Sequence, residues 1–168
     1  MSPDHKTQLL ICVDGSATAL HAIRVAAQLH PGASSVILSA WRPAALMGYG
    51  WSPITPSFAD VDDSIEQACT AAANAGVKLA NELGLTARAE TVRTLGSIAG
   101  AIVTRARTGD CDLIVIGTSG HSILGSAVLG SVSTAVLHHA PMPLLLIRPV
   151  DVDMREPVTA ELAEVARV

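Results

Sequence analysis

The chain has 168 residues, of which 49% are hydrophobic, and a formal net charge of −4. This length is typical of one domain that buries a core of its own. The acidic balance excludes general nucleic-acid binding, which needs a basic face, and no apolar run approaches the roughly 20 residues of a membrane helix.

The cysteine pattern and the polar start of the chain point to a cellular compartment. The three cysteines, Cys12, Cys69 and Cys111, are odd in number and form no C-x-x-C pair. They favour neither a disulfide framework nor a zinc site, so we expect small core residues with reduced thiols. The first residues, MSPDHKTQ, are polar and lead directly into an apolar run, without the pattern of a signal peptide. We therefore expect a soluble, cytoplasmic protein without membrane contact.

Apolar runs alternate with helical patterns along the chain. Short continuous apolar runs are typical of strands buried on both faces, and apolar residues recur at helical spacing between them. Residues 86–92 instead alternate small or apolar with charged residues, which is typical of an edge strand. In chain order we expect a strand at 9–13, a helix at 16–29, a strand at 36–41, a helix at 60–83, a strand at 86–92, a helix at 97–107, a strand at 113–116, a helix at 131–139 and a strand at 144–147.

This alternation predicts an α/β protein with a parallel sheet and helices on both faces. In such sheets a ligand binds beyond the C-terminal ends of the strands, where the strand order reverses. The first strand ends in Asp14-Gly15-Ser16 and the fourth in a glycine-rich turn from Gly117. If these two strands are neighbours, the two turns face one crevice. The turn after the first strand has a second interpretation, as a plain helix cap.

Residues 42–60 are rich in proline and glycine, so we expect no regular structure there. The four aromatic residues of the chain, Trp41, Tyr49, Trp51 and Phe58, lie in this segment or at the strand end before it. Aromatic side chains on a long loop rarely stay in water. They cover the core of the protein, a ligand or another subunit, and the sequence leaves these three alternatives open.

The stretch from 113 to 149 carries the strongest functional signal. A glycine-rich loop between a buried strand and a helix exposes backbone N–H groups, and such groups at a helix start bind phosphate. The P-loop motif fails because Ser126 occupies the lysine position, and the chain has no G-x-G-x-x-G, G-x-S-x-G or H-E-x-x-H. The spacing that fits is G-x2-G-x9-G-S, formed by Gly117, Gly120, Gly130 and Ser131. We expect Gly117 and Gly120 to allow close backbone approach and positive φ.

Four segments accompany this glycine spacing: the LLICVDGS start, the DLIVIGTSGH turn, the LGSVSTAV helix opening and the closing P-x-P-LLLIRP strand. With them, the chain resembles the universal stress protein family, in its single-domain, ATP-binding branch. The resemblance implies an open five-stranded parallel sheet in the order 3-2-1-4-5, a Rossmann-like fold. It covers most of residues 1–149, which we expect to form one nucleotide-binding domain. The tail at 150–168 lies outside it, and is expected to be a short helix or disordered.

The resemblance also implies a binding site for ATP with Mg²⁺ or Mn²⁺. The glycine turn and the helix start would hold ribose and phosphates, the acidic residue after the first strand would contact the nucleoside, and the end of the second strand would recognise adenine. Trp41 is bulkier than the small residue common at its position, and either stacks on the base or narrows the slot. The implied cofactor-binding residues are Cys12, Val13, Asp14, Ala40, Trp41, Ile116, Gly117, Gly120, His121, Gly130, Ser131, Val132 and Ser133.

The last strand, 144–147, would be the second edge of the sheet, yet it is apolar throughout. A bare apolar edge is avoided in native proteins. In the family this strand pairs antiparallel with its copy in a second subunit, so we expect a two-fold homodimer through Leu144 to Arg148.

We expect an ATP-binding module of stress response or signalling with little or no turnover, since no catalytic residue or side-chain metal ligand can be assigned. One alternative is an interaction protein that needs no nucleotide or prefers AMP or cyclic AMP. A slow ATPase, with a water oriented by Asp14, is the least favoured.

Overall fold

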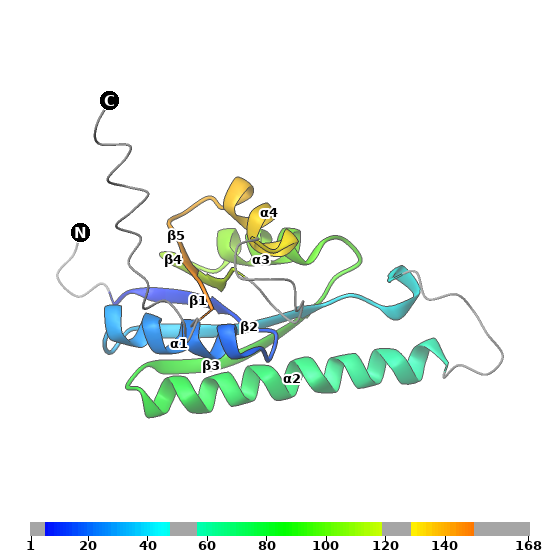
Figure 1. The fold of residues 1–168 in the computed structure, drawn as a ribbon, viewed down its shortest axis with the longest axis horizontal. Helices are drawn as coiled ribbons and strands as arrows, with labels where there is room; N and C mark the ends of the chain where they lie inside the picture. Colours follow the sequence, from blue (N-terminus) through cyan, green and yellow to red (C-terminus); the bar gives the residue numbers. More distant parts are fainter. Residues whose placement is uncertain (1–5, 48–56, 119–128, 150–168) are drawn as a thin grey trace, which may run out of the picture.

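The computed structural model describes residues 6–47, 57–118 and 129–149. Strands and helices alternate along the chain (Figure 1). The elements are β1 (Gln8–Cys12), α1 (Ala17–Leu29), β2 (Ser34–Trp41), the 3-10 helix η1 (Ala44–Leu46), α2 (Phe58–Glu82), β3 (Thr86–Arg93), α3 (Ile98–Thr108), β4 (Leu113–Gly117), α4 (Ser131–His139) and β5 (Leu144–Ile147).

The five strands form one parallel sheet in the order β3-β2-β1-β4-β5. This is the predicted fold class, and the prediction is confirmed. The chain runs outward from β1 to β3, then returns to β4 on the other side of β1. The strand order therefore reverses between β1 and β4, whose C-terminal ends lie side by side. That position is where open α/β sheets bind ligands.

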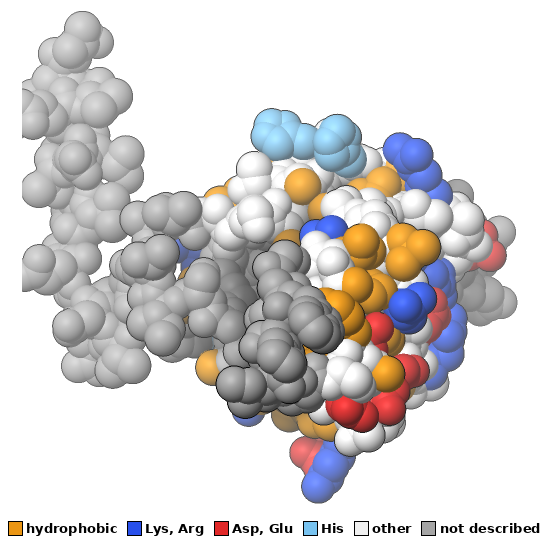
Figure 2. Space-filling model, turned by 90° about the vertical axis from the view of Figure 1, so that its right-hand side faces the viewer, with side chains coloured by type: hydrophobic (Ala, Val, Ile, Leu, Met, Phe, Trp, Pro, Cys, Tyr) orange, Lys and Arg blue, Asp and Glu red, His pale blue; other side chains and the backbone are white. Residues whose placement is uncertain are grey.

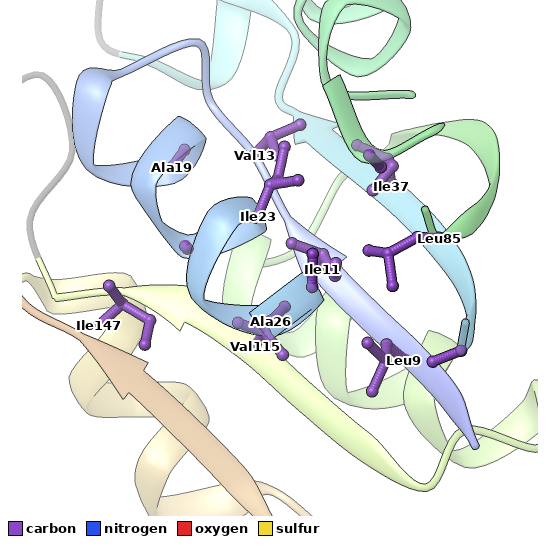
Figure 3. Close-up of a cluster of buried hydrophobic side chains, with 14 residues drawn as sticks. Leu9, Ile11, Val13, Ala19, Ile23, Ala26, Ile37, Leu85, Val115 and Ile147 are labelled. Atoms are coloured by element: carbon purple, nitrogen blue, oxygen red, sulfur yellow. The ribbon is translucent and has the colours of Figure 1, made fainter. Parts of the chain in front are cut away.

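Helices cover both faces of the sheet. The helices α1 and α2 cover one face, and α3 and α4 cover the other (Figure 1). Since side chains alternate along a strand, Leu9, Ile11 and Val13 of the first strand region pack toward α1, while Leu10 and Cys12 pack toward α3 and α4. Two separate apolar clusters result, one on each face. Figure 3 shows the α1 cluster, in which Ile23 lies beside Val13 and Ile11.

The two ends of the proline- and glycine-rich segment 42–60 are more ordered than predicted. Residues 44–46 form η1, and α2 begins at Phe58. The prediction of no regular structure was wrong at these places because two hydrogen bonds fix them. The Ala44 N–H donates to Asp62 at 2.7 Å, and the Asp60 N–H donates to Oγ of Ser57 at 3.2 Å, which caps α2. Residues 48–56, with Tyr49 and Trp51, lie outside the described residues.

The helix starts differ in how they are capped. A serine precedes α1, α2 and α3, and its Oγ accepts a hydrogen bond from the N–H three residues later. At α4 the cap position is Gly130, which makes no side-chain hydrogen bond. The first backbone N–H groups of a helix have no partner inside it. Because glycine has no side chain, the cap residue of α4 leaves these donors unoccupied, in contrast to the three serine caps.

Candidate functional site

A cavity of about 330 Å³ opens at the C-terminal ends of β1, β2 and β4, on the face covered by α3 and α4. It lies at the strand-order reversal, where the topology predicts a ligand. Its described lining residues are Cys12, Val13, Asp14, Ser16, Ala19, Leu38, Ala40, Ile98, Ile102, Ile116, Gly117, Thr118, Gly130, Ser131, Val132 and Ser133.

The inner part of the cavity is an apolar slot between the sheet and α3. Cys12, Ala40 and Ile116 belong to three neighbouring strands and line the cavity from the sheet. Ile98 and Ile102, one helical turn apart, line it from α3. These apolar walls and the small side chain of Ala40 leave room for a planar ring system. The faces of such a ring need no hydrogen bonds.

The outer part of the cavity is formed by the start of α4. The Gly130 N–H donates to the carbonyl of Thr118 at 2.7 Å, and Oγ of Ser133 lies 3.1 Å from the same oxygen. A Cβ added at Gly130 would lie 3.2 Å from that carbonyl oxygen, so glycine permits the close approach of α4 to the end of β4. The helix dipole and the uncapped N–H groups together favour an anion at this position.

A tight turn after β1 supplies the acidic side of the cavity. Gly15 has φ +84°, a conformation that glycine adopts at no steric cost. Oδ1 of Asp14 accepts the Ser16 N–H at 2.9 Å, and Oγ of Ser16 accepts the Ala19 N–H at 3.2 Å. The serine is therefore the helix cap, as the second interpretation of this turn predicted. The carboxylate of Asp14 is held at the exposed rim of the same cavity.

The structure brings the predicted site residues together with three exceptions. Gly120 and His121 lie outside the described residues, and Trp41 does not line the cavity. The expected positive φ at Gly117 is wrong, because this residue is still part of β4; Gly15, Gly32 and Gly84 are the glycines with positive φ in the described part of the chain.

Trp41 packs against the protein itself. Its side chain is buried, and the guanidinium of Arg93 lies 5.5 Å from its ring centroid. Its carbonyl oxygen accepts the Thr94 N–H at 2.9 Å. Its neighbour Ala40 points the other way, into the cavity, because strand side chains alternate between the two faces. Of the three alternatives for the aromatic residues, the structure supports packing against the protein's own core for Trp41.

Some lining residues were not among the predicted site residues. Ser16 and Thr118 belong to the two turns that were expected to face one crevice, whereas Ala19, Leu38, Ile98 and Ile102 were not assigned to the site. Ile98 and Ile102 are four residues apart, a spacing typical of one inward helix face, but the sequence does not indicate that this part of the face meets a cavity.

The described lining contains no lysine or arginine, and Asp14 is its one acidic residue. Burial, with a smaller contribution from Cys111, raises the pKa of the Cys12 thiol to about 12. The thiol is therefore protonated and neutral at physiological pH. Among the described lining residues, the groups that favour an anion are the backbone N–H groups at the start of α4. Figure 2 shows this end of the molecule, where acidic side chains gather in the lower part of the view.

An apolar slot that leads to an uncapped helix start, at the reversal point of a parallel sheet, defines a nucleotide-type binding fold. The model of the universal stress protein family matches residues 7–148. The chain belongs to this family.

Solved structures agree with the fold. The universal stress protein UspA from Lactobacillus plantarum is 22% identical, with a TM-score of 0.69, and the match covers 86% of this chain and 100% of that one. A universal stress protein from Archaeoglobus fulgidus in complex with dAMP is 21% identical with a TM-score of 0.58, covering 86% and 98%. A family member from Arabidopsis thaliana with AMP bound is 18% identical with a TM-score of 0.59, covering 84% and 90%.

Among the residues that the structure describes, no helix has both the length and the hydropathy to cross a membrane.

Proposed function

We propose that this protein binds ATP in the cavity between β1, β4, α3 and α4. The observation that carries the proposal is the continuity of an apolar slot with the start of α4, where the cap residue is a glycine without a side chain. Adenine fits the slot beside Ala40 and Ile116, and the phosphates fit the N–H groups of Ser131, Val132 and Ser133. Relatives solved with AMP and with dAMP support an adenine nucleotide as the class of ligand.

The roles of the individual residues follow from this placement. Gly117 and Gly130 let the backbone approach ribose and phosphate. Gly120 and His121 lie outside the described residues, and their part in the site is proposed from the sequence. Cys12, Val13 and Ile116 form the floor under the base. Asp14 reaches the ribose end, where its carboxylate accepts hydrogen bonds from hydroxyl groups. Trp41 supports the slot from behind, through the strand that carries Ala40.

A divalent cation completes the site. The triphosphate is highly charged and the described lining offers no cationic side chain, so Mg²⁺ or Mn²⁺ must offset that charge. No three histidine, cysteine or acidic residues come together in the described residues. The phosphate oxygens and water would therefore provide most of the metal ligands, as Mg²⁺ prefers.

The protein acts as a cytoplasmic stress-response or signalling module with little or no turnover. The Cys12 thiol is protonated, and we assign no other nucleophile among the described lining residues. The functional unit is a homodimer in which the outer edge of β5, Leu144 to Arg148, pairs with its copy. Residues 1–149 form the binding domain, and the tail at 150–168 is a separate segment.

Calorimetric titrations with ATP, AMP and adenosine, each with and without Mg²⁺, test this assignment. We expect ATP affinity to rise about tenfold or more with Mg²⁺, and AMP affinity to change less. Mass spectrometry of the ligand released from denatured, freshly purified protein identifies the natural nucleotide. Saturable AMP or cyclic AMP binding with no ATP binding would support the alternative ligand, and no binding of any of them would reject the proposal.

Two further measurements test the quaternary and catalytic claims. A monomer in sedimentation at micromolar concentration would contradict the β5 dimer. Steady-state phosphate release far above the background of an incidental ATPase, lost in Asp14→Ala, would contradict the claim of little turnover.

A further inference from the structure

Within the described part of the chain, the edge strand β3 has backbone N–H and C=O groups that pair with no other strand. In the described residues β3 pairs with β2 alone. The Thr86 N–H donates to Ala33, and the Thr94 N–H donates to Trp41. In a parallel pair the hydrogen-bonding direction alternates along the strand, so even-numbered residues of β3 face β2. The N–H and C=O groups of Ala89, Thr91 and Arg93 therefore face outward.

The beginning of this edge is closed, whereas its middle is open. Oδ1 of Asn81, at the end of α2, accepts the Ala87 N–H at 3.0 Å. This side chain takes the place that a further strand would occupy at residue 87. No comparable side-chain acceptor meets the outward N–H groups of residues 89 and 91 in the described part of the chain. The open part of the edge thus extends from residue 88 to residue 93.

A groove of about 440 Å³ runs between this edge and α3. The strand end lines it with Val92 and Thr94, and α3 lines it with Ala101 and Thr104. Gly96 and Gly100 also line the groove and add no side chain to it. An added strand on β3 would lie at the mouth of this groove, with every second side chain directed into it.

The groove has a small excess of positive charge, although the whole chain carries a net charge of −4. Arg93 and Arg105 both line it. The guanidinium of Arg93 lies over the Trp41 ring and 3.8 Å from Oδ2 of Asp62, so its charge is offset there. The excess charge comes from the group around Arg105. Glu90, just outside the lining, is shared by two arginines: it lies 3.1 Å from Nη1 of Arg88 and 2.5 Å from Nε of Arg105. This group of three side chains keeps one positive charge, and the side chain of Arg88 is 61% exposed.

From these observations we infer that the β3–α3 groove binds an acidic, extended segment of a partner protein by β-strand addition. Main-chain hydrogen bonds to the outward groups of Ala89 and Thr91 provide affinity, and alternate side chains in the groove provide specificity. Charge selects the occupant, since acidic side chains complement the arginines. A second copy of this chain would bring the same positive charge to the same edge, and is disfavoured.

A labelled eight-residue peptide of alternating glutamate and valine serves as the probe, and fluorescence anisotropy measures its binding. Thr91→Pro removes the outward N–H, which an edge strand tolerates, and Thr104→Trp fills the groove from an exposed helix position. We expect each variant to weaken binding about tenfold or more. Thr91→Ala and Thr104→Ala keep the N–H and the open groove, and are expected to bind like the unaltered protein.

Two controls separate this inference from neighbouring explanations. A peptide of alternating lysine and valine is expected to bind at least about tenfold more weakly, and Gly130→Leu, which targets the nucleotide cavity, is expected to leave peptide affinity unchanged. Equal binding of both peptides, equal binding by Thr91→Pro and Thr91→Ala, or no binding up to about 1 mM would overturn the inference. So would a self-associated species that Thr91→Pro dissociates, because a second copy would then occupy the edge.

Discussion

The two faces of the sheet use similar strand residues but end differently at the C-terminal edge. On the α1 face, Ala22 and Ala26 bring the helix close to the strands, and Ile23 is fully buried against them. On the other face, α3 and α4 leave the hollow next to Ala40 and Gly117. The α1 face is closely packed, which stabilises the fold. The opposite face is less closely packed at the C-terminal ends of the strands, and this leaves the cavity. The comparison predicts opposite consequences for the same substitution on the two faces.

The largest expected change in the free energy of unfolding comes from truncation of Ile23. Ile23→Ala leaves a void in a closed core, which costs about 2–5 kcal/mol of unfolding free energy, and the nucleotide affinity of the folded protein stays unchanged. Ile98→Ala on the cavity face is the matched variant. Ile98 is half-buried beside an existing hollow, so its truncation costs less stability and lowers nucleotide affinity. Urea denaturation and calorimetry measure the two quantities, and equal stability losses would contradict the comparison.

The reverse experiment adds volume to each face. A Cβ at Gly76 of α2 would lie 2.7 Å from Cγ2 of Ile37, so Gly76→Val overpacks the closed face and is expected to cost about 1–3 kcal/mol or more. Ala40→Val adds its methyl groups to the cavity. Its thermal midpoint should stay close to that of the unaltered protein, while nucleotide binding weakens about tenfold. A strong loss of stability in Ala40→Val would show that the hollow is not accessible space.

The Cys12 thiol reports on the cavity face through pH. Its pKa is raised from 9.0 to about 12 in the folded protein, so the folded state keeps a proton that the unfolded state loses. This contribution to stability is complete below pH 9 and disappears as the pH rises toward 12. Unfolding free energies measured between these limits should fall less steeply in Cys12→Ala than in Cys69→Ala. Identical slopes in the two variants would contradict the burial of this thiol.

The smallest expected change in the free energy of unfolding concerns Glu90 of β3, which pairs with Arg105 of α3. The hydrogen bond from Arg105, followed by the charges of Arg105 and Arg88, lowers the pKa of Glu90 below its ordinary value despite partial burial. The carboxylate therefore stabilises the fold above the unfolded pKa of a glutamate, and this contribution is lost as the pH falls through its lowered folded value. Glu90→Gln is expected to lose about 0.5–1 kcal/mol at neutral pH. Chemical denaturation at neutral and acidic pH measures this difference, which should vanish in acid.

Much of the fold could be predicted because each strand is either continuously apolar or clearly alternating. The LLIC and LIVI runs identified the buried centre of the sheet, and the pattern TARAETV identified β3 as an edge. Element boundaries shifted by one or two residues where caps such as Ser57 decided them. These caps depend on local hydrogen bonds, which apolar periodicity does not record.

The candidate site was only partly visible in the sequence. The glycine spacing and Asp14 identified its polar side, because turns and helix starts have local signatures. The opposite directions of Ala40 and Trp41 depend on the strand register, and a shift of one residue exchanges them. The contribution of Leu38 and Thr118 depends on how far α3 and α4 stand from the sheet. That separation is a property of packing between distant segments.

The most direct test of nucleotide binding in this cavity is a calorimetric titration of Mg²⁺–ATP into Gly130→Leu and Gly96→Leu. At position 130 the new side chain meets the Thr118 carbonyl oxygen at 3.2 Å from its Cβ and enters the mouth of the cavity. At position 96 the nearest atom to the added Cβ is Oγ1 of Thr94 at 3.6 Å, an ordinary contact outside the cavity. We predict that Gly130→Leu loses binding by about a hundredfold or more while Gly96→Leu binds like the unaltered protein. Equal ATP affinities in the two variants, both folded, would contradict the assignment of the site.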